Sequence, residues 1–568
     1  MITGSLHTVN GRYRPSLYYL ALLLILLVIA YWPISFHVFS LKNDALNYFL
    51  PVRRLVSESY SQGLLPLWTP YLNLGYPLHG DMQSGVWNPI VQLFSLFGTY
   101  SLYTLQLETL LYIYLGGAGM FFLLRHFALH PLANLLAAVA YMLCGFNSDS
   151  CQFLNWIAGT AFLPFVFLFY YRCLQENSFI QGIYADTALF FLFTCAYPAD
   201  FIITCYVLAA LLIVKLVQSG WKKEKIDTRN FFLAHASLVA VFLVLSAPAI
   251  LSYMQSLPLQ ERGSGASYEE VMSNSLHPAL LSSFTTPLGI WKMPGVSITD
   301  PLERNSYIGL GGFIILILAF LWKSSNPLLR FSKWAVLVFL LFSFGEMGGI
   351  RIISYYLLPL LDTFRHPANA RMFTLFFSCI LVAYSFQALL ANEIPAGKIH
   401  WAWSLTTAIL LLILGLSLFT PIGLFSPGYF SSLFTKGNDA SIGAGLKTKL
   451  EQLRFADIVI FNTLIQLLFL FIFYRYLFKK PNYRFFAFFA ILNSVLFTML
   501  FQPFTVVKKT RAFQTQQKIN SVAVKGYPIP DIQVPLKELG RDNEKYMGEI
   551  GCLNLYNKKP GRSEYRIS

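Results

Sequence analysis

The sequence predicts an all-α polytopic membrane protein with about thirteen transmembrane helices. First, hydrophobic residues make up 56% of the 568 residues and charged residues only 12%, whereas a soluble domain carries about 25% charged residues. Second, apolar stretches long enough to cross a bilayer recur along the chain. Third, positively charged residues fall on alternate links between these stretches, as the positive-inside rule requires.

The apolar stretches are the predicted transmembrane helices. The third, fifth and ninth are marginal, because two are short and Asp186 interrupts the other. The first is too long for a signal-peptide core and lacks a small-residue cleavage site, so we expect a retained anchor. The thirteen stretches are 17–39, 105–124, 132–147, 157–173, 179–197, 200–218, 231–256, 307–322, 333–345, 371–391, 400–420, 457–478 and 484–502.

Lys and Arg residues orient the set. They precede the first stretch and follow the second, fourth, sixth, eighth, tenth and twelfth, so all lie on the cytoplasmic side if the N-terminus is inside. An odd number of spans then places the C-terminus outside. The predicted units are a transmembrane domain, 1–502, and an exported tail, 503–568. The predicted outer loops are 40–104, 257–306, 346–370 and 421–456.

The net charge of +15, from 42 Lys and Arg against 27 Asp and Glu, does not indicate nucleic-acid binding. Much of it is the orientation signal on the inner links together with the basic tail. The tail is too short for a large core. It is expected to form a small β-rich module or an arm that packs on the first outer loop, where it positions an acceptor or binds anionic lipid.

The first outer loop holds most of the polar residues of interest. Asp44 lies just beyond the first stretch, and the segment 45–60 is expected to form a short helix on the membrane surface. Arg53 and Arg54 would then reach lipid phosphates. A turn-rich run with many Gly and Pro residues follows, and we expect packing to order it. The residues expected to face lipid are Tyr48, Leu50, Leu55 and Val56.

This loop resembles the first outer loop of the GT-C superfamily of membrane glycosyltransferases, and within it the YfhO-like bacterial family. Two later elements are also similar to that family: the runs 275–278 and 287–289 ahead of Tyr307-Ile308-Gly309, and Phe364-Arg365-His366-Pro367 with Arg371, which carries one extra residue before the arginine. The matching residues of the first loop are Asp44, Tyr48, Pro51, Gly63, Leu67, Trp68, Gly75, Pro77, Gln83, Gly85, Asn88 and Pro89.

The resemblance implies transfer of a sugar from a polyprenyl-phosphate donor to a cell-envelope glycan or lipid acceptor. Inverting transfer needs a carboxylate that deprotonates the acceptor hydroxyl, and Asp44 is placed for this at the membrane boundary. Alternatively, Asp44 caps the helix that follows it. Asp149, in the short turn after the third stretch, is the candidate second acid, with a solvated turn residue as the alternative.

The leaving phosphate needs cations rather than a strong acid. Arg365, His366 and Arg371 are the candidates, because the guanidinium fork suits phosphate oxygens; interfacial anchoring is the alternative. Further candidates for substrate binding are Tyr48, Arg53, Arg54 and Gln83.

No cofactor is expected to be required, and the lack of a DxD motif disfavours a tightly held metal, although transient Mg²⁺ or Mn²⁺ is compatible with the sequence. The expected location is the bacterial inner membrane, with membrane lipids as the surroundings and reaction at the outer face. Two other functions stay open. A lipid-linked glycan flippase or small-solute transporter would use Asp186 inside the membrane, and a non-catalytic assembly scaffold would keep only the fold.

Overall fold

The computed structural model describes residues 16–72, 75–222, 227–259, 265–419, 455–523 and 555. Within these ranges it is almost entirely helical, which confirms the predicted all-α polytopic class. Nine of the described helices are long and apolar enough to cross a membrane, and three more are apolar but shorter. The count of thirteen spans stays a prediction, although every predicted stretch overlaps at least one helix.

Those helices follow the predicted order along the chain. Several start at a proline in the first turn, where the missing N–H removes no intrahelical bond. They are α1 (Ser16–Ala30), α5 (Leu102–His126), α6 (Pro131–Met142), α8 (Leu154–Glu176), α9 (Phe179–Cys195), α10 (Pro198–Lys222), α11 (Thr228–Ser256), α13 (Leu310–Leu321), α14 (Pro327–Ser343), α16 (Arg371–Leu390), α17 (Ala396–Phe419), α20 (Phe455–Tyr474) and α21 (Tyr483–Thr505).

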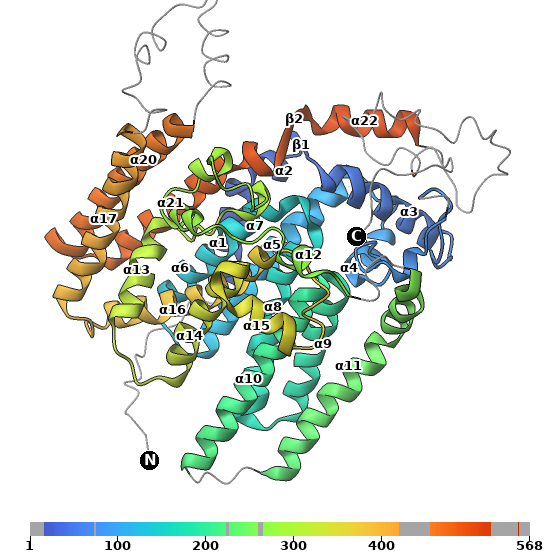
Figure 1. Ribbon diagram of the computed structural model, residues 1–568, viewed down its shortest axis with the longest axis horizontal. Helices are drawn as coiled ribbons and strands as arrows, with labels where there is room; N and C mark the ends of the chain where they lie inside the picture. Colours follow the sequence, from blue (N-terminus) through green and yellow to red (C-terminus); the bar gives the residue numbers. More distant parts are fainter. Residues whose placement is uncertain are drawn as a thin grey trace, which may run out of the picture.

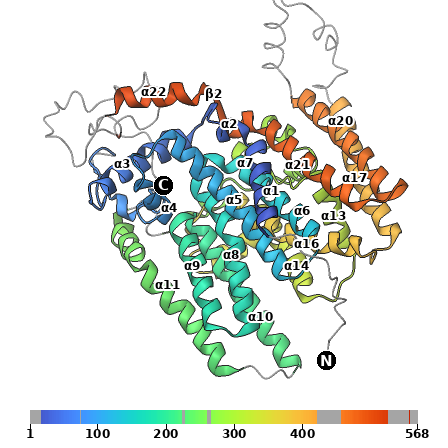
Figure 2. The same ribbon diagram turned by 180° about the vertical axis from the view of Figure 1, so that it is seen from behind.

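The bundle has a buried centre and an apolar periphery. The span that contains α6 is 89% buried, and the span that contains α16 is 83% buried. The spans of α11 and α17 are each only 22% buried. Exposed Leu, Val and Phe side chains cover α11 and α17, as expected of lipid-facing helices. Figure 1 shows α17 and α20 together at one edge of the molecule, and Figure 2 shows α1 beside α5 at the back.

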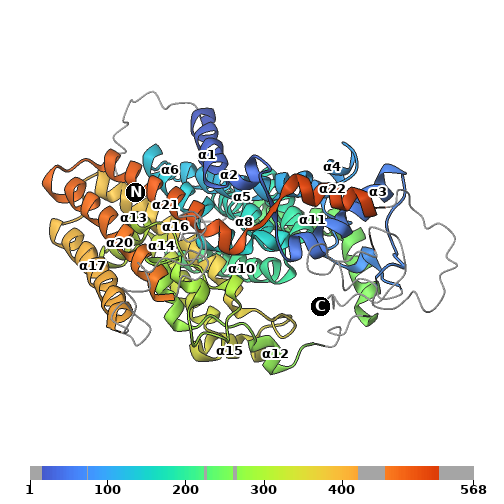
Figure 3. The same cartoon turned by 90° about the horizontal axis from the view of Figure 1, so that it is seen from above.

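The first outer loop forms a compact unit at the opposite edge from α17 and α20 (Figure 3). A π-helical turn, Ala45–Phe49, continues directly into α3 (Leu50–Ser61), and α4 (Pro89–Ser95) packs against α3. Asn88 caps α4 through its side-chain oxygen, which accepts from the amides of Ile90 and Val91. The expected surface helix is therefore present, but other parts of the loop cover it.

The burial of this helix corrects one expectation from the sequence. Tyr48, Leu50, Leu55 and Val56 were expected to face lipid, yet each is at most 4% exposed. The Gly- and Pro-rich run folds back over them and is ordered by internal hydrogen bonds, such as Trp87 Nε1 to the His79 carbonyl at 2.8 Å.

The described start of the tail packs on other parts of the chain, while the role of the whole tail stays a prediction. Strand β2 (Val507–Arg511) pairs antiparallel with β1 (Phe39–Leu41), at the start of the first outer loop. Helix α22 (Ala512–Val522) then packs on β1 and on the start of α5. The predicted boundary at residue 502 falls inside α21. The outer loop 421–456, apart from Phe455 and Ala456, and most of the tail lie outside the described residues.

Candidate functional site at the loop end of the bundle

The predicted outer segments meet at one end of the bundle, here called the loop end, which holds the β1–β2 pair and α22 in Figure 1. Contacts between distant segments establish this end. The Gly145 amide donates to the Tyr307 carbonyl at 2.7 Å, and Thr505 Oγ1 donates to the Ser148 carbonyl at 2.7 Å. The helical connectivity therefore delivers the candidate residues to one region, although the side of the membrane that it faces stays a prediction.

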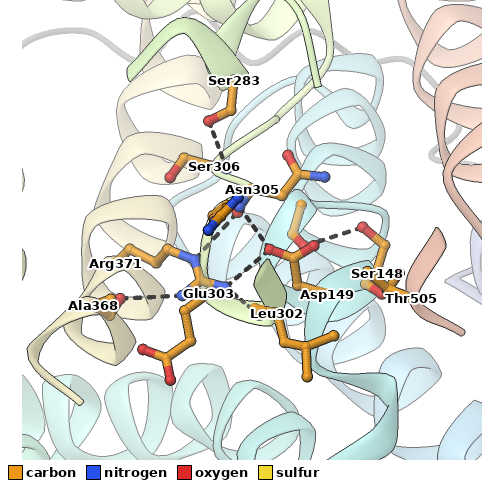
Figure 4. Close-up of polar contacts among 12 residues, drawn as sticks. Ser148, Asp149, Ser283, Leu302, Glu303, Asn305, Ser306, Ala368, Arg371 and Thr505 are labelled. Atoms are coloured by element: carbon orange, nitrogen blue, oxygen red, sulfur yellow. Dashed lines mark hydrogen bonds and ion pairs between the residues drawn. The ribbon is translucent and has the colours of Figure 1, made fainter. Parts of the chain in front are cut away.

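Asp149 and Arg371 form a fully buried ion pair at the centre of this end (Figure 4). Asp149 ends the short helix α7 (Gly145–Asp149), and Arg371 begins α16. Arg371 Nη2 lies 3.3 Å from Asp149 Oδ2, which also accepts the Asn305 amide at 2.6 Å. Asp149 Oδ1 has no hydrogen-bond partner among the described residues. Asp149 is thus a buried carboxylate, not a solvated turn residue.

Protein groups accept four hydrogen bonds from the Arg371 guanidinium, which has five N–H donors. Besides Asp149, it donates to the carbonyls of Leu302, Asn305 and Ala368 at 3.2–3.3 Å. Its carbon lies 4.8 Å from the centre of the Phe146 ring. Because Arg371 is 0% exposed and makes four hydrogen bonds inside the protein, it positions the 302–305 turn and is not placed to bind a substrate phosphate directly.

His366 extends this network toward the surface. Its Nδ1 lies 2.5 Å from Glu303 Oε1 and 3.1 Å from Asn274 Nδ2. The imidazole packs edge-on against Trp156, with ring centroids 5.4 Å apart. Glu303 Oε2 has no hydrogen-bond partner within the described ranges. The sequence reasoning missed Glu303, although its position in the polar run before Tyr307 was a usable signal.

A small cavity of about 20 Å³ lies beside His366, with room for about one water molecule. Arg365 and His366 line it together with three polar residues that sequence reasoning did not select: Asp200, Arg351 and Asn369. All three are at most 5% exposed. Asp200 Oδ2, Arg351 Nε and both polar atoms of the Asn369 amide lack hydrogen-bond partners in the described structure. Buried polar groups are rarely left unpaired, so this cavity has the chemistry of a ligand or water site.

Arg351 belongs to α15 (Ile350–Leu357), an amphipathic helix at the same end. Tyr356 and Leu357 are 70% and 72% exposed, whereas Arg351 is 2% exposed. Arg351 Nη2 donates to the Phe364 carbonyl at 2.7 Å. Burial lowers the pKa of Arg351 to about 10, so the side chain still carries a positive charge at neutral pH. The helix therefore presents apolar residues outward and a cation inward.

Asp44 lies at the start of the Ala45–Phe49 turn and is half-buried. Its side chain makes no capping hydrogen bond to that turn, which disfavours the alternative reading as a cap. The Ala45–Phe49 turn packs against the turn Ser150–Gln152, which directly follows Asp149. Asp44 and Asp149 thus come from neighbouring segments.

Lys42 is the cation on the Asp44 segment. Its Nζ donates to the carbonyls of Pro503 and Phe504 at 3.2 and 2.5 Å and lies 5.6 Å from the centre of the Trp291 ring. Burial lowers the pKa of Lys42 to about 8. The ammonium fixes the end of α21 against the first outer loop, close in sequence to Asp44.

Tyr48 and Gln83 organise the first loop around Asp81. The Tyr48 hydroxyl donates to Asp81 Oδ2, and the backbone N–H of Gln83 donates to Asp81 Oδ1 at 2.9 Å. Burial raises the pKa of the Asp81 carboxyl. Binding of substrate by Tyr48 and Gln83 stays a prediction, but Tyr48 is 4% exposed and already holds a partner.

Arg53 and Arg54 differ although they are adjacent. Arg53 is 1% exposed and pairs with Glu108 of α5 at 2.8 Å, so it does not reach lipid phosphates as expected. Arg54 pairs with Glu58 at 3.1 Å on the same helix and is only partly buried. Helical geometry explains the difference, since successive residues point about 100° apart.

Two further predictions concern metals and transport. No group of three His, Cys, Asp or Glu side chains suited to hold a metal ion occurs among the described residues. Asp186, the basis of the transporter alternative, is buried in α9, and neither of its carboxyl oxygens has a hydrogen-bond partner in the described ranges. No ion pair between Asp186 and a Lys or Arg side chain occurs among the described residues.

Comparisons with known proteins find similarity among solved structures. No protein-family model matches the sequence, and no curated protein matches it. Among solved structures, the chain is similar to ArnT from Cupriavidus metallidurans in the apo state, with a TM-score of 0.47 and 13% sequence identity, covering 96% of this chain and 84% of that chain. Neither the activity nor the site residues of this chain follow from a likeness at this level.

Proposed function

We propose that the protein is a GT-C-type membrane glycosyltransferase that moves a sugar from a polyprenyl-phosphate donor to a cell-envelope glycan or lipid acceptor. The reaction would occur at the outer face of a bacterial inner membrane, with the N-terminus cytoplasmic and the C-terminus outside. One observation carries the proposal. The Asp44 segment packs on the segment that follows Asp149, and Asp149 pairs with Arg371. Arg371 donates to the carbonyl of Leu302, and the next residue, Glu303, contacts His366 in the cavity lined by Arg365.

In the proposed reaction, a carboxylate takes up the proton of the acceptor, and cations stabilise the negative charge of the leaving phosphate. The Asp44 carboxylate removes the proton of the acceptor hydroxyl, and the acceptor oxygen attacks the anomeric carbon with inversion. The bond from that carbon to the phosphate oxygen breaks, and its electron pair leaves with the polyprenyl phosphate. No strong general acid is needed, because the leaving phosphate is stabilised by cations.

Arg365 and Arg351 are the proposed phosphate partners. Both line the cavity, and α15 turns its apolar face outward directly beside it. A lipid-linked phosphate would lie with its chain along Tyr356 and Leu357 and its charge toward the two arginines. The present cavity holds about one water molecule, so binding requires the 358–366 segment to move outward. Asp149 and Arg371 position the 302–305 turn and, through Glu303, the imidazole of His366.

The test is a transfer assay on the purified full-length chain in lipid nanodiscs. The probes are undecaprenyl-phosphate glucose, undecaprenyl-phosphate galactose and undecaprenyl-phosphate aminosugars, with extracted envelope glycans and glycolipids as acceptors. Asp44→Asn is expected to lower the transfer rate by about 10²–10⁴-fold, the usual contribution of a general base. Full activity of Asp44→Asn would overturn the assignment.

Asp227→Asn is the matched control. Asp227 caps α11 at the opposite end of the bundle by accepting the Asn230 amide, and Asn caps helices equally well. This variant is expected to keep wild-type activity. Movement of lipid-linked sugar across sealed liposomes without any transfer would instead favour the flippase alternative.

A further inference from the structure

A second, larger hollow lies on the loop end between α3, the start of α5 and α22. Its volume is about 540 Å³, within the usual range for sites that bind small molecules. It is separate from the Arg365 cavity and shares no lining residue with it. The groove is lined by Arg54, Thr99, Ser101, Tyr103, Gln516 and Asn520.

The groove is built by a fixed contact between the first loop and the tail. Gln516 is 8% exposed, and its Oε1 accepts the Leu102 amide at 2.9 Å while its Nε2 donates to Asn520 Oδ1 at 2.9 Å. Asn520, which lines the groove, therefore has its side-chain oxygen engaged by Gln516. The Thr99 hydroxyl and the Asn520 amide nitrogen donate to no group among the described residues.

The lining carries one aromatic face and little free charge. Tyr103 is fixed edge-on against the His37 imidazole, with ring centroids 4.9 Å apart. The charge of Arg54 is compensated by Glu58 at 3.1 Å. Hydroxyl and amide groups beside an aromatic ring suit an uncharged ligand rich in hydroxyl groups, because such a ligand offers both hydrogen-bonding groups and C–H faces.

We propose that this groove binds an uncharged oligosaccharide. The Thr99 hydroxyl and the Asn520 amide bond to sugar hydroxyls, and the Tyr103 ring packs on a sugar face. The site goes beyond the proposed reaction, because it requires neither a donor lipid nor Asp44. Its position suits the acceptor chain: Gln106 of α5 donates to the Phe39 carbonyl of β1 at 2.7 Å, and β1 ends three residues before Asp44.

Binding is measured on the full-length chain in nanodiscs, which exclude sugar-headed detergents that would compete. The probes are cellotetraose and chitotetraose, followed by saturation-transfer NMR and calorimetry without any donor. We expect saturable binding at millimolar concentration for at least one probe. The double variant Thr99→Ala/Asn520→Ala is expected to weaken it at least tenfold, and Tyr103→Leu at least threefold.

Gln517→Ala is the matched control, because Gln517 lies exposed on the same helix and does not line the groove. It is expected to bind as wild type does, with all variants unfolding at the wild-type temperature. No saturable binding of either probe, or equal binding by the double variant, would overturn the proposal. Glucose 6-phosphate binding in place of both neutral probes would also overturn it.

The outcome separates from the proposed transferase activity. Asp44→Asn is expected to keep the oligosaccharide affinity within twofold while losing transfer. If the groove variants bind no probe but transfer at the wild-type rate, the groove proposal is wrong and the transferase proposal stands. If Asp44→Asn transfers sugar at the wild-type rate while the groove binds the probes as expected, the assignment of Asp44 as the base is wrong and the groove proposal stands.

Discussion

Two buried arginine–carboxylate pairs stabilise the loop end in different ways. Arg53 and Glu108 join α3 to α5 at 2.8 Å, and the Tyr100 hydroxyl also donates to Glu108. Arg371 and Asp149 are 3.3 Å apart, but Arg371 also donates to three backbone carbonyls. The first pair depends on mutual charge compensation, whereas the second is one link in a wider backbone network.

The difference indicates which carboxylate is available for another role. Glu108 is engaged by a cation and a hydroxyl, while Asp149 keeps one oxygen without a hydrogen-bond partner in the described structure. The carboxyl groups of Glu303 and Asp300 also interact electrostatically with the Arg371 guanidinium. Asp149 is therefore less essential to its arginine than Glu108 is to Arg53.

The largest expected effect tests the first pair. Arg53→Met leaves the Glu108 charge buried without its cation and should lower the free energy of unfolding by about 3–5 kcal/mol. The measurement is thermal unfolding of the purified chain in detergent. Arg53→Met/Glu108→Leu should recover most of this loss, since replacing both charges removes the unpaired one. A single variant as stable as wild type would show that the pair is not structural.

A smaller effect is expected for the second pair. Asp149→Asn keeps an oxygen that accepts the Asn305 amide, and Arg371 keeps its three carbonyl partners, so the loss should be about 1–2 kcal/mol. Transfer activity should fall much further than stability, because the proposed positioning of His366 needs the charged network. A loss of stability as large as that of Arg53→Met would remove the contrast between the two pairs.

The smallest effect concerns Asp81, a buried carboxyl whose pKa is shifted by burial and hydrogen bonds without a cation. Its folded-state pKa is raised, so the native state binds more protons just above pH 3.8, and stability falls as pH rises through that window. Asp81→Asn removes this titration and still accepts from Tyr48, so the change at pH 7 should be below about 1 kcal/mol.

Thermal unfolding of wild type and Asp81→Asn from pH 4 to pH 8 measures this dependence. The stability of wild type relative to the variant should decrease toward high pH. An increase would mean that the carboxylate is stabilised in its charged form, as a cation partner would do.

Much of the fold follows from local sequence. Apolar stretches predicted every long helix, because a lipid environment leaves the backbone few structures other than helices. Asp44, Asp149, Arg371 and His366 were selected from the sequence, and all four lie at the loop end. These residues could be selected by residue type and position because charged residues are scarce in this chain. Each charged residue on a predicted outer segment was therefore a candidate for a specific role.

Roles were less predictable than positions. Arg53 and Arg54 have the same sequence environment, yet one is buried against α5 and the other lines the second groove. Arg351, Asp200 and Asn369 drew no attention as cavity residues because they come from three segments more than 150 residues apart at the extremes. No local pattern marks an amide that will lack a hydrogen-bond partner after folding.

The sequence by itself determined that the chain is a helical membrane protein, the order of its helices and the segments that carry polar residues, since these depend on hydropathy and local charge. Only the tertiary structure decided which charges are paired and buried, which carboxyl oxygens stay unpaired, and that the tail closes a groove with the first loop. Those outcomes depend on contacts between distant segments, and burial then decides whether a charged side chain is a structural partner or a group available for binding.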